Sequence, residues 1–346
     1  MTRSEPRTAM VIGANGGIGS EVTNSLLKHG WNVRALVRNI STDHPLYPDN
    51  QIDWRKGDAM SSNDVLNASR GVDVIVHAVN PPGYRNWQQL AMPMLDNTIR
   101  AAIVNKARIV LPGTIYNFGP DVLDTPSEDS PQNPETRKGA IRKEMESRIE
   151  EATRLGATAL IVRAGDYFGA NAGNNWFSQC LVKPGKPVKA ITYPGKRKTG
   201  HQWAYLPDVA ETMVRLLDHD DVMEPFARFH MDGHWDHDGM QMIAAIRKAV
   251  GNPKITVRQL PWSIVNLLRP VSVFCHEASE VRYLWQESVR MDNAKLTAVL
   301  GAEPKTDLDV AVKTTLAGLG CIDPVINAVS GSEFTVPSLA AVQSRP

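Results

Sequence analysis

The fold is decided by the stretch Met10-Val11-Ile12-Gly13-Ala14-Asn15-Gly16-Gly17-Ile18-Gly19. Its glycines follow the spacing G-x-x-G-x-x-G, between an apolar β-branched run and an amphipathic run. In a dinucleotide site the first glycine allows a tight turn, the second lets the backbone approach a pyrophosphate, and the third lets the helix pack closely on the strand. The pyrophosphate then lies at the positive N-terminus of the helix. Glycines also mark plain turns, but this position favours a nucleotide site made by Gly13, Asn15, Gly16, Gly17, Ile18 and Gly19.

The end of the next strand indicates which nucleotide binds. Residues 32–38 alternate in the manner of a strand. An NAD-preferring site usually has Asp or Glu at the end of this strand, where it binds the ribose 2′-hydroxyl. Arg38 stands there instead, and a guanidinium can pair with a 2′-phosphate. We therefore expect NADP, with NAD possible; the alternative is a solvated surface arginine.

Composition narrows the class of protein. The chain has 346 residues and a net charge of +1, which argues against bulk electrostatic binding of nucleic acid. It has no apolar run of the roughly 20 residues that span a bilayer, and its N-terminus has no hydrophobic signal core. Its three scattered cysteines suggest reduced thiols and give no zinc spacing. We expect a cytoplasmic protein with a small-molecule substrate, no nucleic-acid or membrane partner, and possibly a homodimeric state.

Strand and helix patterns alternate through the first half of the chain. Strands are expected near 8–13, 32–38, 51–57, 72–78, 107–111 and 158–163, with helices near 17–29, 62–70 and 87–105. This rhythm predicts an α/β fold with a doubly wound, Rossmann-type parallel sheet. We expect a dinucleotide-binding domain at 7–170 with a helix near 206–218 packing back on it, a mainly substrate-binding domain at 171–322, and a loosely held tail at 323–346.

Ligands of such a sheet gather at the carboxyl ends of its strands. Asp58 could accept a hydrogen bond from an adenine amino group, or it could cap a turn or helix. Asp166 could contact the cofactor, or it could cap a turn. The further cofactor contacts expected at these ends are Asp58, Ala59, Ala78, Val79, Asn80, Ala164 and Asp166.

These motifs resemble those of the extended and atypical short-chain dehydrogenase/reductase superfamily, often labelled NAD-dependent epimerase/dehydratase. The similarity covers roughly residues 8–320: the glycine motif, Asp58, the segment 113–119 and the segment 203–210. It implies a nicotinamide dinucleotide and places Thr114 at the position of the catalytic Ser/Thr. The catalytic Tyr-x-x-x-Lys of the superfamily is missing, because Lys138 takes the tyrosine position and Arg142 the lysine position.

Lys138-Gly139-Ala140-Ile141-Arg142 is similar to the corresponding segment of isoflavone-reductase-like members. That resemblance implies that Lys138 transfers a proton and contacts the cofactor, while Arg142 holds a ribose or tunes Lys138. Helical spacing independently puts Lys138 and Arg142 on the face of apolar Ile141, Met145 and Ile149, in a helix expected to be capped by Asn133. A lysine that works near neutrality needs burial or a neighbouring cation, which Arg142 or an oxidised nicotinamide could supply. The alternative is that both side chains extend to the rim.

Three further residues are candidates for substrate contact: Tyr116, which could replace the missing phenol, Trp176 and His201. The histidines and aspartates of 230–238 suggest a metal site, but their spacing favours a strand end, a turn and a helix cap, so we expect no metal.

We favour an NADP(H)-dependent oxidoreductase that transfers a hydride to or from a small apolar or aromatic carbonyl or enone, with Thr114, Lys138 and Arg142 as catalytic residues. Two alternatives are a nucleotide-sugar epimerase or dehydratase with tightly held NAD, and a non-catalytic NADP-sensing regulator.

Overall fold

The computed structural model describes residues 6–40, 51–81, 87–122, 125–172 and 175–323. The tail expected at 323–346 therefore lies outside the described residues, apart from Asp323.

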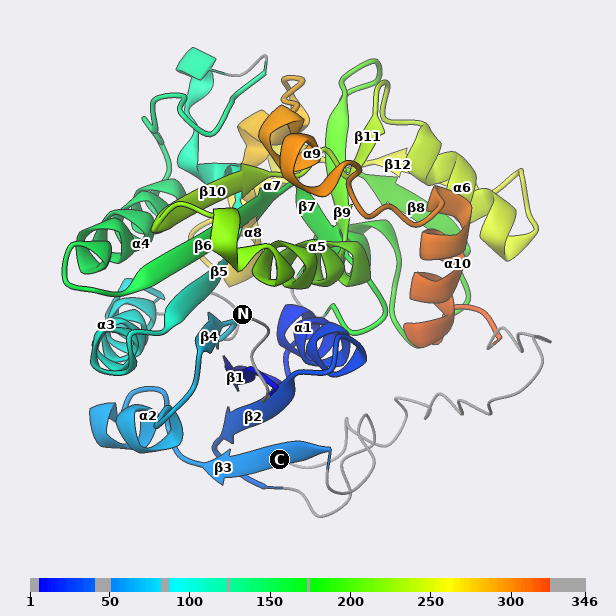
Figure 1. Ribbon diagram of the computed structural model, residues 1–346. Coiled ribbons are helices and arrows are strands. Elements are labelled where there is room, and N and C mark those ends of the chain that lie inside the picture. The colour runs from blue at the N-terminus through cyan, green and yellow to red at the C-terminus, as the bar shows by residue number, and fades with distance from the viewer. Residues whose placement is uncertain (1–5, 41–50, 82–86, 123–124, 173–174, 324–346) are drawn as a thin grey trace.

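A parallel sheet of seven strands forms the centre of the described structure (Figure 1). Its order is β10-β6-β5-β4-β1-β2-β3, and each neighbouring pair is parallel. The expected Rossmann-type α/β fold is thereby confirmed. The strands are β1 (Thr8–Ile12), β2 (Asn32–Val37), β3 (Ile52–Lys56), β4 (Val74–His77), β5 (Arg108–Thr114), β6 (Thr158–Ala164) and β10 (Phe226–His230).

Helices cover both faces of this sheet, which explains why a central strand such as β4 is buried throughout. On one face α5 (Leu206–Asp218) packs against α1 (Gly17–Lys28) through an apolar layer that includes Val22, Leu26 and Met213. The other face carries α2 (Ser62–Ala68), α3 (Trp87–Asn105) and α4 (Arg137–Thr153). Helix α4 begins later than expected because Thr136, rather than Asn133, caps it by accepting a hydrogen bond from the Gly139 N–H.

The remaining elements form a smaller unit beside the carboxyl edge of the sheet, with its own core around Trp203, Trp285 and Phe177. Its strands are β7 (Asp166–Phe168), β9 (His201–Tyr205) and β11 (His234–Asp236) in one sheet, and β8 (Ala190–Tyr193) with β12 (Thr256–Gln259) in another. Its helices are α6 (Gln241–Val250), α7 (Trp262–Leu268), α8 (Val273–Glu280) and α10 (Leu308–Gly318), while α9 (Ala294–Leu300) packs near β10. Short turns of 3-10 or π helix are η2 (Ile115–Asn117), η3 (Pro120–Val122), η4 (Phe177–Leu181), η5 (Asp220–Val222) and η6 (Arg282–Trp285).

Strand β10 departs from the expected division of the chain. It comes from the part assigned mainly to a substrate domain, yet it pairs with β6 and completes the dinucleotide sheet. Strand β10 pairs there because the outer edge of β6 presents backbone N–H and C=O groups that need hydrogen-bonding partners. No helix among the described residues is both long and apolar enough to cross a membrane.

Candidate active site

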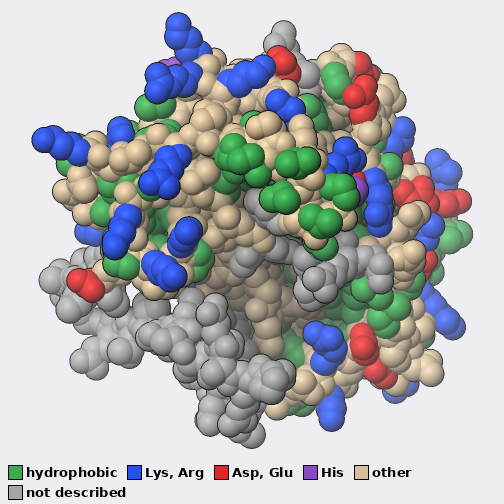
Figure 2. Space-filling model, turned by 180° about the vertical axis from the view of Figure 1, so that it is seen from behind, with side chains coloured by type: hydrophobic (Ala, Val, Ile, Leu, Met, Phe, Trp, Pro, Cys, Tyr) green, Lys and Arg blue, Asp and Glu red, His purple; other side chains and the backbone are tan. Residues whose placement is uncertain are grey.

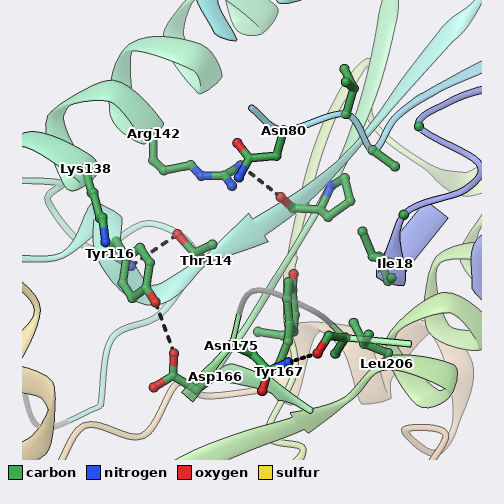
Figure 3. Close-up of a pocket in the computed structure, with 18 of the residues that line it drawn as sticks. Ile18, Asn80, Thr114, Tyr116, Lys138, Arg142, Asp166, Tyr167, Asn175 and Leu206 are labelled. Atoms are coloured by element: carbon green, nitrogen blue, oxygen red, sulfur yellow. Dashed lines mark hydrogen bonds between the residues drawn. The ribbon is translucent and has the colours of Figure 1, made fainter. Parts of the chain in front are cut away.

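A cleft of about 870 Å³ lies at the carboxyl edge of the sheet, where the loops after β1, β4, β5 and β6 meet α4 and α8. Figure 3 shows polar side chains of this cleft that come from different elements, among them Asn80 after β4, Thr114 at the end of β5, and Lys138 and Arg142 on α4. The sequence-predicted residues that line it are Gly13, Asn15, Gly16, Gly17, Ile18, Arg38, Ala78, Val79, Asn80, Thr114, Tyr116, Lys138, Arg142, Ala164, Asp166 and Trp176.

The glycine loop is shaped as a dinucleotide cradle. Gly13 has a φ of +93°, and a Cβ there would lie 2.8 Å from the backbone of Ala78. Gly19 does not line the cleft; a Cβ on it would lie 2.0 Å from the Gly13 carbonyl oxygen, so its role is to let α1 pack against the loop. Helix α1 has a glycine, Gly16, at its N-cap, so no side chain caps its first N–H groups, and its first turn carries no acidic residue. The N-terminus of α1 therefore offers N–H groups and a positive dipole to an anionic ligand.

Two predicted adenine-side residues are not brought into the cleft. The Asp58 carboxylate accepts a hydrogen bond from the Met60 N–H at 2.9 Å, and the Asp58 N–H donates to Asp64 Oδ2 at 2.9 Å. Ala59 is buried and its carbonyl accepts from Asn97 at 2.9 Å. Asp58 thus takes the turn-capping arrangement that was its alternative. Arg38, in contrast, directly follows β2, is exposed and lines the cleft.

Thr114 and Arg142 reach the cleft from adjacent elements. Thr114 ends β5, and its Oγ1 accepts the Tyr116 N–H at 3.3 Å, which shapes η2. Arg142 projects from α4 and donates through Nη1 to the Pro112 carbonyl at 3.3 Å. Within the described structure, two nitrogen atoms of the cleft are buried without a hydrogen-bond partner: Nε of Arg142 and Nε2 of His77. Such buried polar atoms normally have partners, so both fit a site that a polar ligand completes.

Lys138 is buried in the cleft and forms an ion pair that the sequence did not reveal. Its Nζ lies 2.9 Å from Glu277 Oε2 and donates to the Glu277 carbonyl at 3.2 Å. Glu277 comes from α8, so the pair joins the two sides of the cleft. We expected Arg142 as the neighbouring cation, but the side chain that faces Lys138 is a carboxylate. Glu277 was missed because it is 139 residues away and no local motif marks it.

A chain of three side chains leads from the cleft into the core. Tyr116 donates its hydroxyl hydrogen to Asp166 Oδ1 at 3.1 Å, and Asp166 Oδ2 lies 2.9 Å from Nε2 of His201. The other ring nitrogen of His201 lies 3.3 Å from the Leu284 carbonyl oxygen. His201 is buried and stacks on Trp285, with ring centroids 3.6 Å apart. The expectation that His201 forms the substrate wall is therefore corrected: it reaches the cleft only through Asp166.

His77 adds a neutral group to the cleft. Burial, assisted by the charge of Arg142, lowers its pKa to about 3. Its Nδ1 lies 2.8 Å from the hydroxyl of Thr98. Because the ring is uncharged near neutrality, its buried Nε2 offers hydrogen bonding without charge.

Part of the cleft lining is apolar. This part includes Trp176 and Ile115 together with three residues that no sequence pattern marked, Val273, Ala278 and Val281. Asn175 and Gln179 add two amides. Helix α8, which carries Val273 and Ala278, was expected only as a helix, because no feature of its sequence indicates that it faces a ligand.

Two of the histidines and aspartates of 230–238 have partners that are not shared with the others. Arg163 Nη1 donates to Nε2 of His230 at 2.9 Å, and Asp236 caps α6 by accepting from the N–H groups of Gln241 and Met242. Over the described ranges no group of three or more such side chains is placed to hold a metal ion. Absence of a metal stays a prediction for the protein itself.

Comparison with known proteins agrees with this architecture. The profile of the NAD dependent epimerase/dehydratase family matches residues 9–230. A curated relative, mouse sterol-4-alpha-carboxylate 3-dehydrogenase, decarboxylating, is 25% identical over 135 residues, which are 37% of this chain and 36% of that protein. The match thus spans about a third of the length of that relative.

Solved structures share the fold over nearly the whole chain. UDP-N-acetylglucosamine 4-epimerase from Bacillus cereus is 17% identical with a TM-score of 0.68, covering 94% of this chain and 99% of that one. UDP-glucuronic acid 4-epimerase from Bacillus cereus in complex with NAD is 16% identical with a TM-score of 0.70, covering 90% and 96%. A putative epimerase from Burkholderia cenocepacia is 16% identical with a TM-score of 0.72, covering 92% and 99%. At these identities the likeness concerns the fold.

Proposed function

Because the chain belongs to the NAD dependent epimerase/dehydratase family, we propose that it is an NADP(H)-dependent oxidoreductase that transfers a hydride to or from a small apolar or aromatic carbonyl or enone. The observation that carries the proposal is one continuous cleft. The same cleft is lined by the glycine loop, by Thr114 and Lys138, and by the apolar side chains of Trp176 and Val281. A dinucleotide on the glycine loop and an apolar substrate on those apolar side chains would meet beside Thr114 and Lys138.

The glycine loop and the N-terminus of α1 would hold the pyrophosphate, and the unpaired Nε–H of Arg142 would donate to a cofactor ribose. When bound, the nicotinamide supplies the hydride chemistry. NADP over NAD rests on Arg38 at the end of β2, where its guanidinium can pair with a 2′-phosphate. The structure from Bacillus cereus that contains NAD comes from a relative too distant to decide this choice.

Thr114 and Lys138 would act at the substrate oxygen. The hydroxyl of Thr114 donates a hydrogen bond to it, and the Lys138 ammonium, held by Glu277, stabilises negative charge that develops there. The resemblance to isoflavone-reductase-like members adds a proton-transfer role for Lys138. Tyr116 is the second group from which a proton can come, because Asp166 and His201 behind it can exchange protons with the phenol.

The test is reduction by NADPH of a panel of aliphatic and aromatic aldehydes, ketones and enones. The rate of each reaction is measured from the oxidation of NADPH. We expect turnover of apolar carbonyls, lost in Thr114→Val, which removes the hydroxyl but keeps the shape. Turnover of UDP-sugars with tightly held NAD, and none of the carbonyl panel, would contradict the proposal.

A second candidate is the NADP-sensing regulator, favoured by one observation. Lys138 is tied to Glu277 across the cleft, which would suit a lysine that fastens two parts of a binding protein rather than one that reacts. Tight NADPH binding without turnover of any carbonyl, and a conformational response to the nucleotide, would favour this candidate.

A further inference from the structure

An exposed apolar surface lies on α7, on the turn that follows it, and on the start of α8. Figure 2 shows hydrophobic side chains gathered beside the hollow of the molecule, on the face where these two helices lie. We call this surface the α7–α8 apolar tip. Its members and exposed fractions are Ile264 52%, Leu267 77%, Leu268 42%, Val271 82% and Val273 44%.

The tip is a projecting segment rather than a flat face. Residues 266–271 are six consecutive exposed residues, and the turn contains Pro270. The base of the segment is anchored, because the indole N–H of Trp262 donates to the Pro194 carbonyl at 2.9 Å and its ring lies 6.2 Å from that of Trp176. Trp176 lines the cleft, so the tip is attached directly to the cleft wall.

The charges around the tip favour an anionic partner. Residues 261–276 contain Arg269 but neither Asp nor Glu. The two carboxylates that follow on α8 are largely buried and have cationic or histidine neighbours: Glu277, 18% exposed, pairs with Lys138 at 2.9 Å, and Glu280, 11% exposed, lies 3.5 Å from His276. The outward surface therefore combines aliphatic side chains with a guanidinium.

The tip is also continuous with the cleft. Val273 is both exposed at the surface and part of the cleft lining, and Ala278 and Val281 continue that apolar lining inward. An apolar molecule leaving a lipid layer at the tip would meet the apolar side chains of Val273, Ala278 and Val281 in the cleft lining.

We propose that the α7–α8 apolar tip docks the protein on the surface of an anionic phospholipid bilayer. Aliphatic side chains enter the boundary between headgroups and acyl chains, while Arg269 pairs with lipid phosphates. A second copy of the chain is the weaker occupant, because a stable dimer buries roughly 800 Å² on each partner and a short projecting turn supplies little area. The expectation of no membrane partner rested on the lack of a spanning run, and a surface that lies on a bilayer needs no such run. The proposal is independent of the reaction assigned above.

The test is sedimentation of the full chain with vesicles. One set contains phosphatidylcholine mixed with phosphatidylglycerol, and the other phosphatidylcholine alone. The test variant is Leu267→Glu with Val271→Glu. The matched control is Val104→Glu with Leu155→Glu, two positions 67% and 65% exposed elsewhere on the surface. Thermal unfolding of each variant checks that it is folded.

We expect the wild type and the control to sediment with the anionic vesicles, and the test variant to partition roughly tenfold or more weakly. Arg269→Gln should weaken binding to the anionic vesicles and leave binding to phosphatidylcholine nearly unchanged. A wild type that stays in the supernatant with both vesicle types overturns the proposal. So does a test variant that binds like the control. Sedimentation velocity without lipid supplies one more outcome: a wild-type dimer that the test variant converts to a monomer would assign the tip to self-association instead.

Discussion

At the scale of single residues, we expect the choice of nucleotide to depend on Arg38. Arg38 stands at the end of β2, where an NAD-preferring site has an acidic residue that binds the ribose 2′-hydroxyl, and its side chain lines the cleft. Arg38 is exposed, so its guanidinium costs little to desolvate, and we expect it to contribute by pairing with the 2′-phosphate.

Arg38→Asp should weaken NADPH binding by roughly 1.5–3 kcal/mol, the usual worth of a hydrogen bond to a charged group, and leave NADH binding little changed. Isothermal titration with both nucleotides measures this difference. Arg55→Asp is the control, since Arg55 is an exposed arginine of the neighbouring strand that does not line the cleft. Wild-type protein that binds NADH as tightly as NADPH would contradict the prediction.

Lys138 carries the second prediction at this scale. Lys138→Ala should lower kcat by roughly 10²–10⁴-fold, the range of general acid–base catalysis, with a much smaller change in nucleotide affinity. Lys138→Tyr should recover little activity, because Arg142 stands where the superfamily has its lysine. Stopped-flow measurement of hydride transfer separates the chemical step from binding. The Glu277→Gln variant serves as a comparison, as it removes the ion pair but keeps the amine. Unchanged kcat in Lys138→Ala would remove the residue from the chemistry.

At the scale of elements, the contact between α1 and the loop after β1 holds the nucleotide cradle. The helix axis can approach the loop only because residue 19 has no side chain, since a Cβ would lie 2.0 Å from the Gly13 carbonyl oxygen. The same approach brings Gly16 and Gly17 to the cleft. The position of the proposed phosphate site would thus be a consequence of helix packing.

Gly19→Ala should push α1 away from the loop. We expect a loss of roughly 2–4 kcal/mol in the free energy of unfolding, in the range of overpacked cores, and loss of nucleotide binding. Chemical denaturation and fluorescence titration with NADPH measure the two effects. Gly169→Ala is the control, because its Cβ would meet only the Leu206 side chain, at 3.3 Å. Equal stability of the two variants would show that α1 is not held at this distance.

At the scale of the whole molecule, burial of histidines couples the fold to pH. Burial, together with the charge of Arg163, lowers the pKa of His230 to about 3, and burial also lowers that of His234 to about 4. An unfolded histidine takes up a proton below about pH 6.5. The unfolded chain therefore binds more protons than the folded chain as pH falls from about 6.5 toward these values, and stability declines in that window.

His230→Gln isolates this effect from the carboxylates that titrate nearby. The difference in the free energy of unfolding between the wild type and this variant should shrink by about 1.4 kcal/mol for each pH unit below about 6.5, since only the wild type loses the contribution of His230. Urea denaturation at several pH values measures it. A difference that does not change between pH 6.5 and pH 5 would mean that His230 is charged in the folded protein.

The last prediction also concerns the whole molecule. Elemental analysis of the purified protein should find no stoichiometric metal, and chelators should leave its activity unchanged. Two of the side chains of 230–238 that suggest a metal site have other partners, since His230 accepts from Arg163 and Asp236 caps α6. Stoichiometric zinc that is lost together with activity would overturn this expectation.

The sequence by itself determined the Rossmann-type sheet, the glycine cradle and the places of Arg38, Thr114 and Lys138 in the cleft. Each of these follows from residues a few positions apart: a strand pattern, a glycine spacing, one helical face. Such local patterns are sufficient because the carboxyl ends of parallel strands meet at one edge whatever the rest of the chain does.

Only the tertiary structure decided what surrounds those residues. It brought Glu277 to Lys138 across 139 positions, placed His201 behind Asp166 rather than in the cleft, added β10 to the sheet and left the α7–α8 apolar tip exposed. Each depends on which distant surfaces pack together, and a pairing of that kind leaves no periodicity in the chain. Asp58 illustrates the limit most simply, because the same carboxylate suits an adenine or a turn, and only the structure shows that it accepts a hydrogen bond from the Met60 N–H.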